Sequence, residues 1–213
     1  LVGEDCPKDF VEARRYLGSA AAQGHAHAQS YLAGMHQDGE GGPQDFVEAR
    51  RLFGLAAVQG VQLAQYILAT MHRRGEGGPK NFAEARRLLG QAVAQGDADW
   101  LGQKLSCASQ NCLGAMHLAG EGGPENHEEA GRFFGLAVAQ GHADSQFNLG
   151  MMKACGMGGP VDGVEAVRLF GLAAAQGHAV AKDMLECDER FQPATATMFA
   201  NMSSFAIAGR EHV

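Results

Sequence analysis

A similar segment recurs five times along the 213-residue chain, and it constrains the fold more than any other feature. Its pattern is approximately G-G-P-x-[D/N]-F-x-E-A-R-R-L-[F/L]-G-x-A-x-x-Q-G. The copies end at Gly24, Gly60, Gly96, Gly141 and Gly177, so the period is 36 residues except for one interval of 45. A fixed period in this range predicts a solenoid, in which each repeat stacks on its neighbours. Such a fold generally offers a long surface to a partner.

Each repeat is expected to contain two helices. In residues 26–60, apolar residues at helical spacing predict a first helix, helix A, over Ala26–Gln37. The glycines and the proline at 39–43 interrupt it, and helix B begins at Asp45. Asp45 and Glu48 match the capping box, in which each side chain accepts a hydrogen bond from a backbone N–H at the helix start. Gly60 is expected to end helix B in the left-handed conformation. The capping pair recurs as Asp9/Glu12, Asn81/Glu84, Asn126/Glu129 and Asp162/Glu165.

Every helix B carries a glycine near its middle. A glycine inside a helix costs about 1 kcal/mol relative to alanine. Because this cost recurs in every copy, we expect a neighbouring helix to approach closely at these positions. The glycines are Gly18, Gly54, Gly90, Gly135 and Gly171.

The pattern predicts one all-α domain of about ten helices over residues 1–190. It consists of a half repeat with helix B only, four full helix pairs, and a polar capping helix from about Val180 to Glu189. Residues 191–213 lack the repeat and form a C-terminal tail. Its apolar residues suit a short amphipathic segment that either folds back or docks elsewhere.

Composition narrows the classes of partner and of compartment. The net charge is −7 without a basic stripe, so a nucleic-acid partner is not expected. No apolar run is long enough to span a bilayer. The five cysteines are odd in number and share no repeat position, which favours thiols in a reducing intracellular compartment, the cytoplasm or an organelle interior. Cys107 and Cys112 are close enough for a disulfide only if their segment is not regular helix. The chain starts with Leu1 on a half repeat, so we expect an incomplete or processed N-terminus, and any targeting segment before it would not be visible in this sequence.

These residues resemble the Sel1-like repeats, a subclass of the tetratricopeptide-like α/α solenoids. The resemblance covers about residues 5–190 and implies a right-handed α/α superhelix. In the first full pair it rests on Ala28, Leu32, Ala33, His36, Gly39, Gly41, Asp45, Ala49, Phe53, Ala56, Ala57 and Gly60. In the fourth pair it rests on Leu149, Gly150, Gly156, Gly158, Asp162, Ala166, Phe170, Ala173, Ala174 and Gly177. Members of this family mostly act as adaptors and scaffolds in multiprotein assemblies, including membrane-bound ones, and some bacterial members are linked to β-lactam binding.

The resemblance implies a non-enzymatic scaffold that needs no cofactor or metal and is a peripheral subunit of a larger assembly. Peripheral contact with a membrane complex is compatible with this role. The alternatives are a β-lactamase-like or ligand-binding enzyme, for which no nucleophile–base pair stands out, and a fragment of a longer regulatory repeat protein. A protein partner would bind the concave face. The helix A positions expected there are Gln29, Ser30, Gln37, Gln65, Arg73, Gln110, Gln146 and Asn148.

Two columns of polar residues recur at fixed repeat positions. His36, His72 and His117 stand where the family usually has tyrosine, with Lys153 in the fourth pair. We expect these histidines to pack like tyrosine with one ring nitrogen hydrogen-bonded, since stacked repeats are too far apart for shared metal ligation. The arginine column follows a glutamate by three residues, which favours i,i+3 pairs on a solvated face over a partner-binding stripe. It comprises Arg15, Arg51, Arg87, Arg132 and Arg168.

The 45-residue interval contains an insertion of nine residues within 97–108. It includes Trp100, the only tryptophan, and the spacing of Leu101, Leu105 and Cys112 predicts that helix A of this pair is extended at its N-terminus. An exposed tryptophan on an extended helix suits a binding anchor for a protein partner. Packing of Trp100 on the adjacent repeat is the alternative.

A second candidate surface comes from leucines that replace a family lysine on helix B. These are Leu55, Leu136 and Leu172. If they face outward, they form an apolar stripe for a partner protein or a membrane-embedded complex. Tight packing between repeats is the competing interpretation, and burial within the chain would exclude the stripe.

Overall fold

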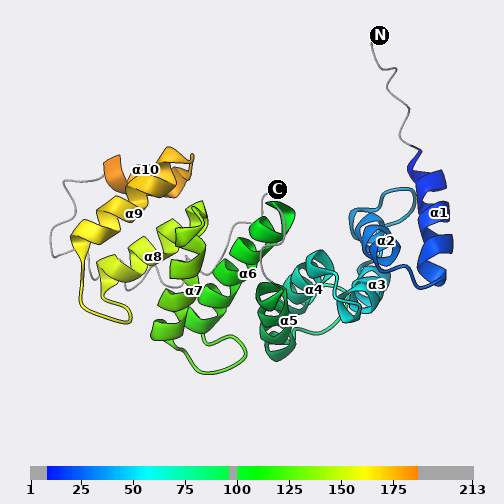
Figure 1. The fold of residues 1–213 in the computed structure, drawn as a ribbon, viewed down its shortest axis with the longest axis horizontal. Helices are drawn as coiled ribbons and strands as arrows, with labels where there is room; N and C mark the ends of the chain where they lie inside the picture. Colours follow the sequence, from blue (N-terminus) through cyan, green and yellow to red (C-terminus); the bar gives the residue numbers. More distant parts are fainter. Residues whose placement is uncertain (1–8, 96–99, 187–213) are drawn as a thin grey trace, which may run out of the picture. The chain divides into compact units, whose positions relative to one another are not determined.

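The computed structural model describes residues 9–95 and 100–186, and these ranges contain ten α-helices and no strand (Figure 1). The all-α prediction is therefore confirmed. The helices are α1 (Phe10–Ala22), α2 (Ala26–Asp38), α3 (Phe46–Val58), α4 (Gln62–Arg74), α5 (Phe82–Ala94), α6 (Trp100–Leu118), α7 (His127–Ala139), α8 (Ala143–Cys155), α9 (Gly163–Ala175) and α10 (Ala179–Glu186).

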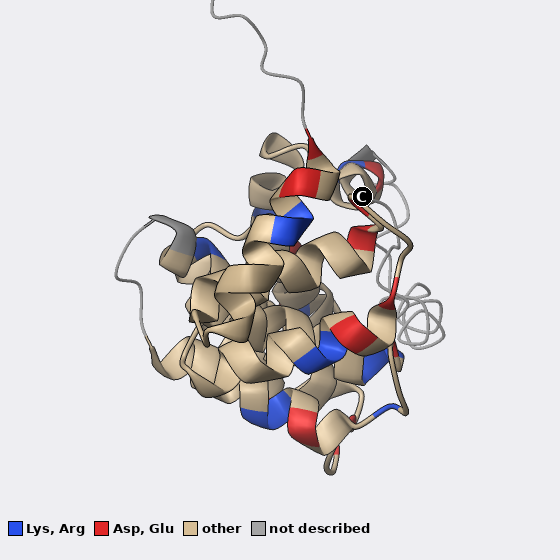
Figure 2. Cartoon of the chain, turned by 90° about the vertical axis from the view of Figure 1, so that its right-hand side faces the viewer, with Lys and Arg blue, Asp and Glu red and all other residues tan. Residues whose placement is uncertain are grey.

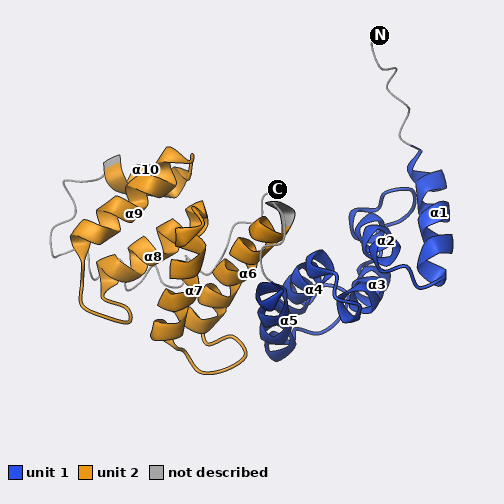
Figure 3. Cartoon of the chain, in the orientation of Figure 1, with its two compact units in different colours: residues 1–95 blue, residues 96–213 orange. Residues whose placement is uncertain are grey.

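The chain divides into two compact units, residues 1–95 and 96–213 (Figure 3). In unit 1, α1 is the lone helix B, and α2/α3 and α4/α5 are the A/B pairs. Unit 2 contains the pairs α6/α7 and α8/α9 and the capping helix α10. The boundary falls just before the insertion. A single domain over residues 1–190 and its right-handed superhelix stay predictions, and the tail 191–213 lies outside the described residues.

The starts of the B helices are confirmed, but the capping box is only half formed. The side chain of Asp45 accepts a hydrogen bond from the backbone N–H of Glu48 at 3.0 Å. The backbone N–H of Asp45, which the Glu48 side chain was expected to satisfy, donates instead to the carbonyl of His36 at 2.8 Å. Because the turn between the two helices brings that carbonyl close, the Glu48 carboxylate is left to pair with Arg51.

Close approach involves other glycines than we predicted. A Cβ atom added at Gly18, Gly54, Gly90, Gly135 or Gly171 would meet no described atom within 4 Å, so the close approach expected at the mid-helix B glycines is wrong. It occurs instead on helix A, at Gly114 and Gly150. There an added Cβ would lie 2.6 Å and 2.7 Å from the buried rings of Phe134 and Phe170. The small residue lets each ring of helix B press against the backbone of helix A.

The turn that joins helix A to helix B also fastens one repeat to the previous one. Gly41 and Gly77 have φ of 69° and 66° and lie against the backbone carbonyls of Phe10 and Phe46, at the start of the preceding helix B. Only glycine combines this left-handed conformation with so close a contact.

The extended helix of the insertion is confirmed. Helix α6 has 19 residues, whereas α2, α4 and α8 have 13 each, and its additional residues lie at its N-terminal end. Cys107 and Cys112 both lie in this regular helix and remain thiols. Among the described helices, none has both the length and the apolar character needed to cross a membrane.

Candidate partner-binding surface

A groove of about 380 Å³ lies between α1 and α3 in unit 1. Gly18, Ala21 and Ala22 of α1 line one side, and Leu52 and Leu55 of α3 line the other. The small side chains on α1 and the absence of any described neighbour at Gly18 leave this space open. The floor and rim are completed by Gly24, Gln29, Leu32, Glu48 and Arg51.

On α3, α7 and α9 an exposed arginine is followed four residues later by an exposed leucine, and we call the exposed face that carries them the helix-B stripe. On α3 it consists of Val47, Arg51, Leu55 and Val58, which are exposed and spaced four, four and three residues apart. This spacing places them on one side of the helix. The equivalent leucines are exposed in each case, with Leu55 at 43%, Leu136 at 42% and Leu172 at 40%. Burial therefore does not exclude the apolar stripe that the sequence predicted.

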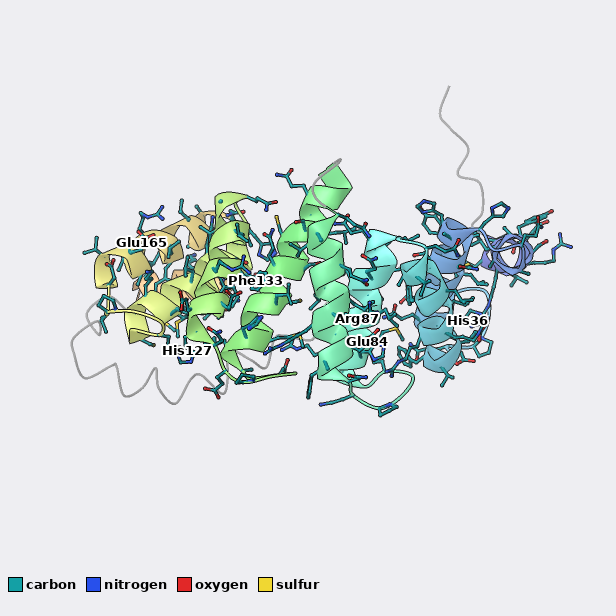
Figure 4. The ribbon with its side chains drawn as sticks, turned by 60° about the horizontal axis from the view of Figure 1, so that its bottom comes forward. His36, Glu84, Arg87, His127, Phe133 and Glu165 are labelled. Atoms are coloured by element: carbon teal, nitrogen blue, oxygen red, sulfur yellow. The ribbon has the colours of Figure 1, made fainter. Side chains whose placement is uncertain are left out.

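The arginines of the stripe are locally neutralised. Arg51 donates from Nε and NH2 to the two carboxylate oxygens of Glu48, at 2.8 and 2.6 Å. This hydrogen bond holds the pKa of Glu48 below its ordinary value. The equivalent Arg87 NH2 and Glu84 Oε1 on α5 lie 2.6 Å apart, and Figure 4 labels both residues. The predicted i,i+3 pairs are thus confirmed, and Figure 2 shows acidic and basic residues interspersed along the helices.

Four of the five glutamines expected on a concave binding face are buried. Gln29 and Gln146 expose only 5% and 4% of their surface, and Gln65 and Gln110 are similarly buried. Each accepts a hydrogen bond from a glutamine at the end of the following helix B. These donors are Gln59 to Gln29, Gln95 to Gln65, Gln140 to Gln110 and Gln176 to Gln146. Their expected exposure to a partner is therefore wrong, because the acceptor glutamines of this polar network lie buried between the two helices of each repeat.

The other helix A candidates have mixed environments. Ser30 is buried, and Asn148 is half-buried and donates to the side-chain oxygen of Asn111 at 3.0 Å. Gln37 and Arg73 occupy equivalent half-buried positions near the ends of α2 and α4. Contact of Gln37 and Arg73 with a partner stays a prediction.

The insertion is only partly described. Helix α6 begins at Trp100, but the side chains of Trp100 and Leu101 lie outside the described structure, so the anchor hypothesis stays a prediction. Leu105 is 8% exposed, which contradicts its expected contact with a partner. The neighbouring Cys107 is also buried and donates from Sγ to Gln140 Oε1 at 3.1 Å. This part of α6 is therefore core of unit 2.

Two histidines of the column are hydrogen-bonded to arginines that were not predicted from the sequence. His36 Nδ1 accepts a hydrogen bond from Arg14 at 2.6 Å, and His72 Nδ1 accepts one from Arg50 at the same distance. The prediction that a ring nitrogen is hydrogen-bonded is confirmed for both, while His117 stacks on Phe133 with ring centroids 5.5 Å apart. The available signal was the doubled arginine of the first three repeats, which is absent from the last two.

The chemistry of this surface suits protein binding. Groups of three or more His, Cys, Asp or Glu side chains that could hold a metal ion do not occur within residues 9–95 and 100–186. The helix-B stripe instead combines exposed aliphatic side chains with ion pairs that need no new partner. Such a mixture is typical of surfaces that another protein covers.

The family model described as Sel1 repeat matches residues 1–25, 26–61, 62–97, 108–142 and 143–178. The chain belongs to the Sel1 repeat family. The matches omit residues 98–107, which correspond to the insertion that we located within 97–108. Members of the Sel1 repeat family generally act as protein–protein interaction scaffolds.

Two solved structures of longer proteins resemble this Sel1 repeat chain. A protective antigen of uropathogenic Escherichia coli strains, which displays an SLR fold, is 27% identical with a TM-score of 0.76 over 95% of this chain. A Sel1 repeat protein from Oxalobacter formigenes is 36% identical with a TM-score of 0.67 over 84% of it. The matches span only 43% and 49% of those proteins. None of the curated proteins compared matches the chain.

Proposed function

We propose that this chain is a non-enzymatic scaffold that binds a partner protein through the helix-B stripe and the groove between α1 and α3. The observation that carries this proposal is the recurrence of an exposed leucine beside an open glycine, as in Gly54–Leu55, Gly135–Leu136 and Gly171–Leu172. The fold does not account fully for either residue, since the glycine weakens the helix and the leucine leaves 40–43% of its surface exposed. A partner that covers the stripe would give both the glycine and the leucine a role. The missing Cβ of the glycine lets the backbone of the partner approach the helix, and the same contact buries the leucine.

Two further regions would extend this surface. Trp100 and Leu101 at the start of α6 provide an aromatic and an aliphatic anchor, and Gln37 and Arg73 provide polar contacts at the ends of helix A. A scaffold with several such regions suits a peripheral subunit of a larger assembly, including one attached to a membrane. An interface of ordinary size buries about 800 Å² on each partner, which requires more than one helix.

Photo-crosslinking in the native cell tests the proposal. A photoreactive phenylalanine analogue is placed at Leu55 or Leu172 on the stripe, or at Tyr31, which is exposed on α2 and serves as the control. We expect crosslinks to one defined protein from the two leucine positions and not from Tyr31. The variant Leu55→Glu/Leu136→Glu/Leu172→Glu should lose this protein and keep its helical circular dichroism and melting temperature.

The same experiment can contradict the proposal. If the folded triple variant retains its partner, or if only Tyr31 forms crosslinks, the helix-B stripe is not the binding surface. A matched variant, Val161→Glu, changes an exposed aliphatic residue in the turn before α9 and should leave binding intact.

A further inference from the structure

Unit 1 contains two equivalent contacts between an arginine and a histidine of successive repeats, which we call the Arg–His clasps. In the first, Arg14 of α1 donates to His36 Nδ1 of α2 at 2.6 Å and to the carbonyl of Glu40 at 3.4 Å. In the second, Arg50 of α3 donates to His72 Nδ1 of α4 at 2.6 Å. It also donates to the carbonyl of Glu76 at 3.2 Å and to that of Pro79 at 3.1 Å. Each clasp therefore fastens a helix B to the next helix A and its turn.

The hydrogen bond defines the protonation state that each clasp needs. Arginine has only donors, so the imidazole nitrogen that faces it must carry a lone pair. A protonated imidazole has N–H groups at both nitrogens, so it cannot accept the hydrogen bond that the arginine donates. It would also place two positive charges next to each other.

The surroundings also disfavour a charged imidazole. Burial lowers the pKa of His36, and Arg14 and Arg51 lower it further, against the opposing effect of Glu48 and Asp45. Burial likewise lowers the pKa of His72, together with Arg50 and Arg87, against the opposing effect of Glu84. Both glutamates already pair with the arginine of their own stripe, at 2.6 Å in each case.

Unit 2 lacks the clasp. The position of Arg14 and Arg50 is occupied by Gly131 in α7 and by Val167 in α9. At the α7/α8 junction, Lys153 occupies the position of the clasp histidine. An arginine opposite this lysine would be repelled by its positive charge. The last two B helices therefore lack the arginine of the clasp, so the clasp is not a property of every repeat.

We propose that the Arg–His clasps are acid-sensitive joints, and that protonation of His36 and His72 loosens α1 from α2 and α3 from α4. A histidine whose pKa falls on folding contributes its full stability above the ordinary value of about 6.5 and loses it as the pH falls through the lowered value. Mild acidification should therefore open unit 1 locally. This inference does not depend on the groove or the stripe binding a partner.

Hydrogen exchange with mass spectrometry on the whole chain tests the proposal. The exchange is measured between pH 7.5 and pH 5.5 and corrected for intrinsic exchange. In the native chain we expect amide protection in α1–α4 to fall as the pH is lowered. The variant His36→Gln/His72→Gln keeps an oxygen acceptor for each arginine but cannot be protonated, so its protection should not depend on pH. His27→Asn, at an exposed position of α2, should behave like the native chain.

Two results would overturn the proposal. One is an equal loss of amide protection in the native chain and in the glutamine variant as the pH is lowered. The other is no loss of amide protection in the native chain. His142, the half-buried N-cap residue of α8, also has its pKa lowered by burial, but its peptides belong to unit 2 and are analysed separately. If the double variant does not fold, NMR titration of the native chain decides, since His36 and His72 must then titrate below the ordinary histidine value.

Discussion

The side chain of Gln59 donates a hydrogen bond to the side-chain oxygen of Gln29 at 2.7 Å, although the two residues are 30 positions apart. Gln29 in turn donates to the carbonyl of Ala21 at 3.2 Å. One buried glutamine of helix A thus joins the ends of two successive B helices, α1 and α3. Gln65 makes the equivalent connection between α3 and α5, since it accepts from Gln95 at 3.0 Å and donates to the carbonyl of Ala57 at 3.3 Å.

Replacing Gln29 with alanine should destabilise unit 1 by about 1–3 kcal/mol, because the Gln59 side chain and the Ala21 carbonyl each lose a buried partner. Gln91→Ala is the matched control on α5, where the side chain is exposed, and should change the free energy of unfolding by no more than about 0.5 kcal/mol. Urea unfolding followed by circular dichroism measures both. Similar effects from the two variants would show that the buried bridge contributes little.

Substitutions of two glycines in the α8/α9 pair should have opposite signs. Gly171→Ala should stabilise the fold by about 0.5–1 kcal/mol, because no described atom lies near the added Cβ and alanine favours the helix. Gly150→Ala should destabilise it by about 1–3 kcal/mol, because the Cβ would lie 2.7 Å from the Phe170 ring. Melting temperatures of the two variants suffice as the measurement. Destabilisation by Gly171→Ala would indicate a close contact that the structure does not show.

The turn glycine Gly77 should tolerate no side chain. Its φ of 66° costs an alanine about 1–2 kcal/mol, and the added Cβ would also collide with the carbonyl of Phe46. We therefore expect Gly77→Ala to lower the urea midpoint of unit 1 strongly. Gly159→Ala provides the comparison, since Gly159 has neither a positive φ nor a described atom within 4 Å of its added Cβ. A native-like midpoint for Gly77→Ala would contradict the proposed fit between turn and helix.

Local features of the fold could be predicted from the sequence because they depend on neighbouring residues. Helix A was expected over Ala26–Gln37 and spans Ala26–Asp38, and the side chain of Asp45 caps α3 as its spacing with Glu48 indicated. Periodicity and capping act within a few residues, so a single repeat contains the necessary information.

Features that depend on the next repeat were not predictable in this way. The polar side chain of Gln29 suggested an exposed face, whereas its burial depends on a donor from Gln59. The cost of Gly54 in its helix was visible in the sequence, but the space beside it was not. The exposure of Leu55 likewise depends on how α1, α2 and α3 pack together.

Two adjacent arginines of α3 should differ in their contribution to stability. Arg50 donates to His72 and to two backbone carbonyls of the next repeat, whereas the exposed Arg51 pairs only with Glu48 of its own helix in the contacts described. Because hydrogen bonds from a charged group contribute about 1.5–3 kcal/mol, Arg50→Ala should destabilise unit 1 by an amount in this range. Arg51→Ala should cost less than about 1 kcal/mol, as is usual for a surface ion pair. Urea unfolding at pH 7.5, where the clasp histidines are neutral, measures the difference. Equal costs for the two variants would mean that Arg50 contributes no more than a surface charge.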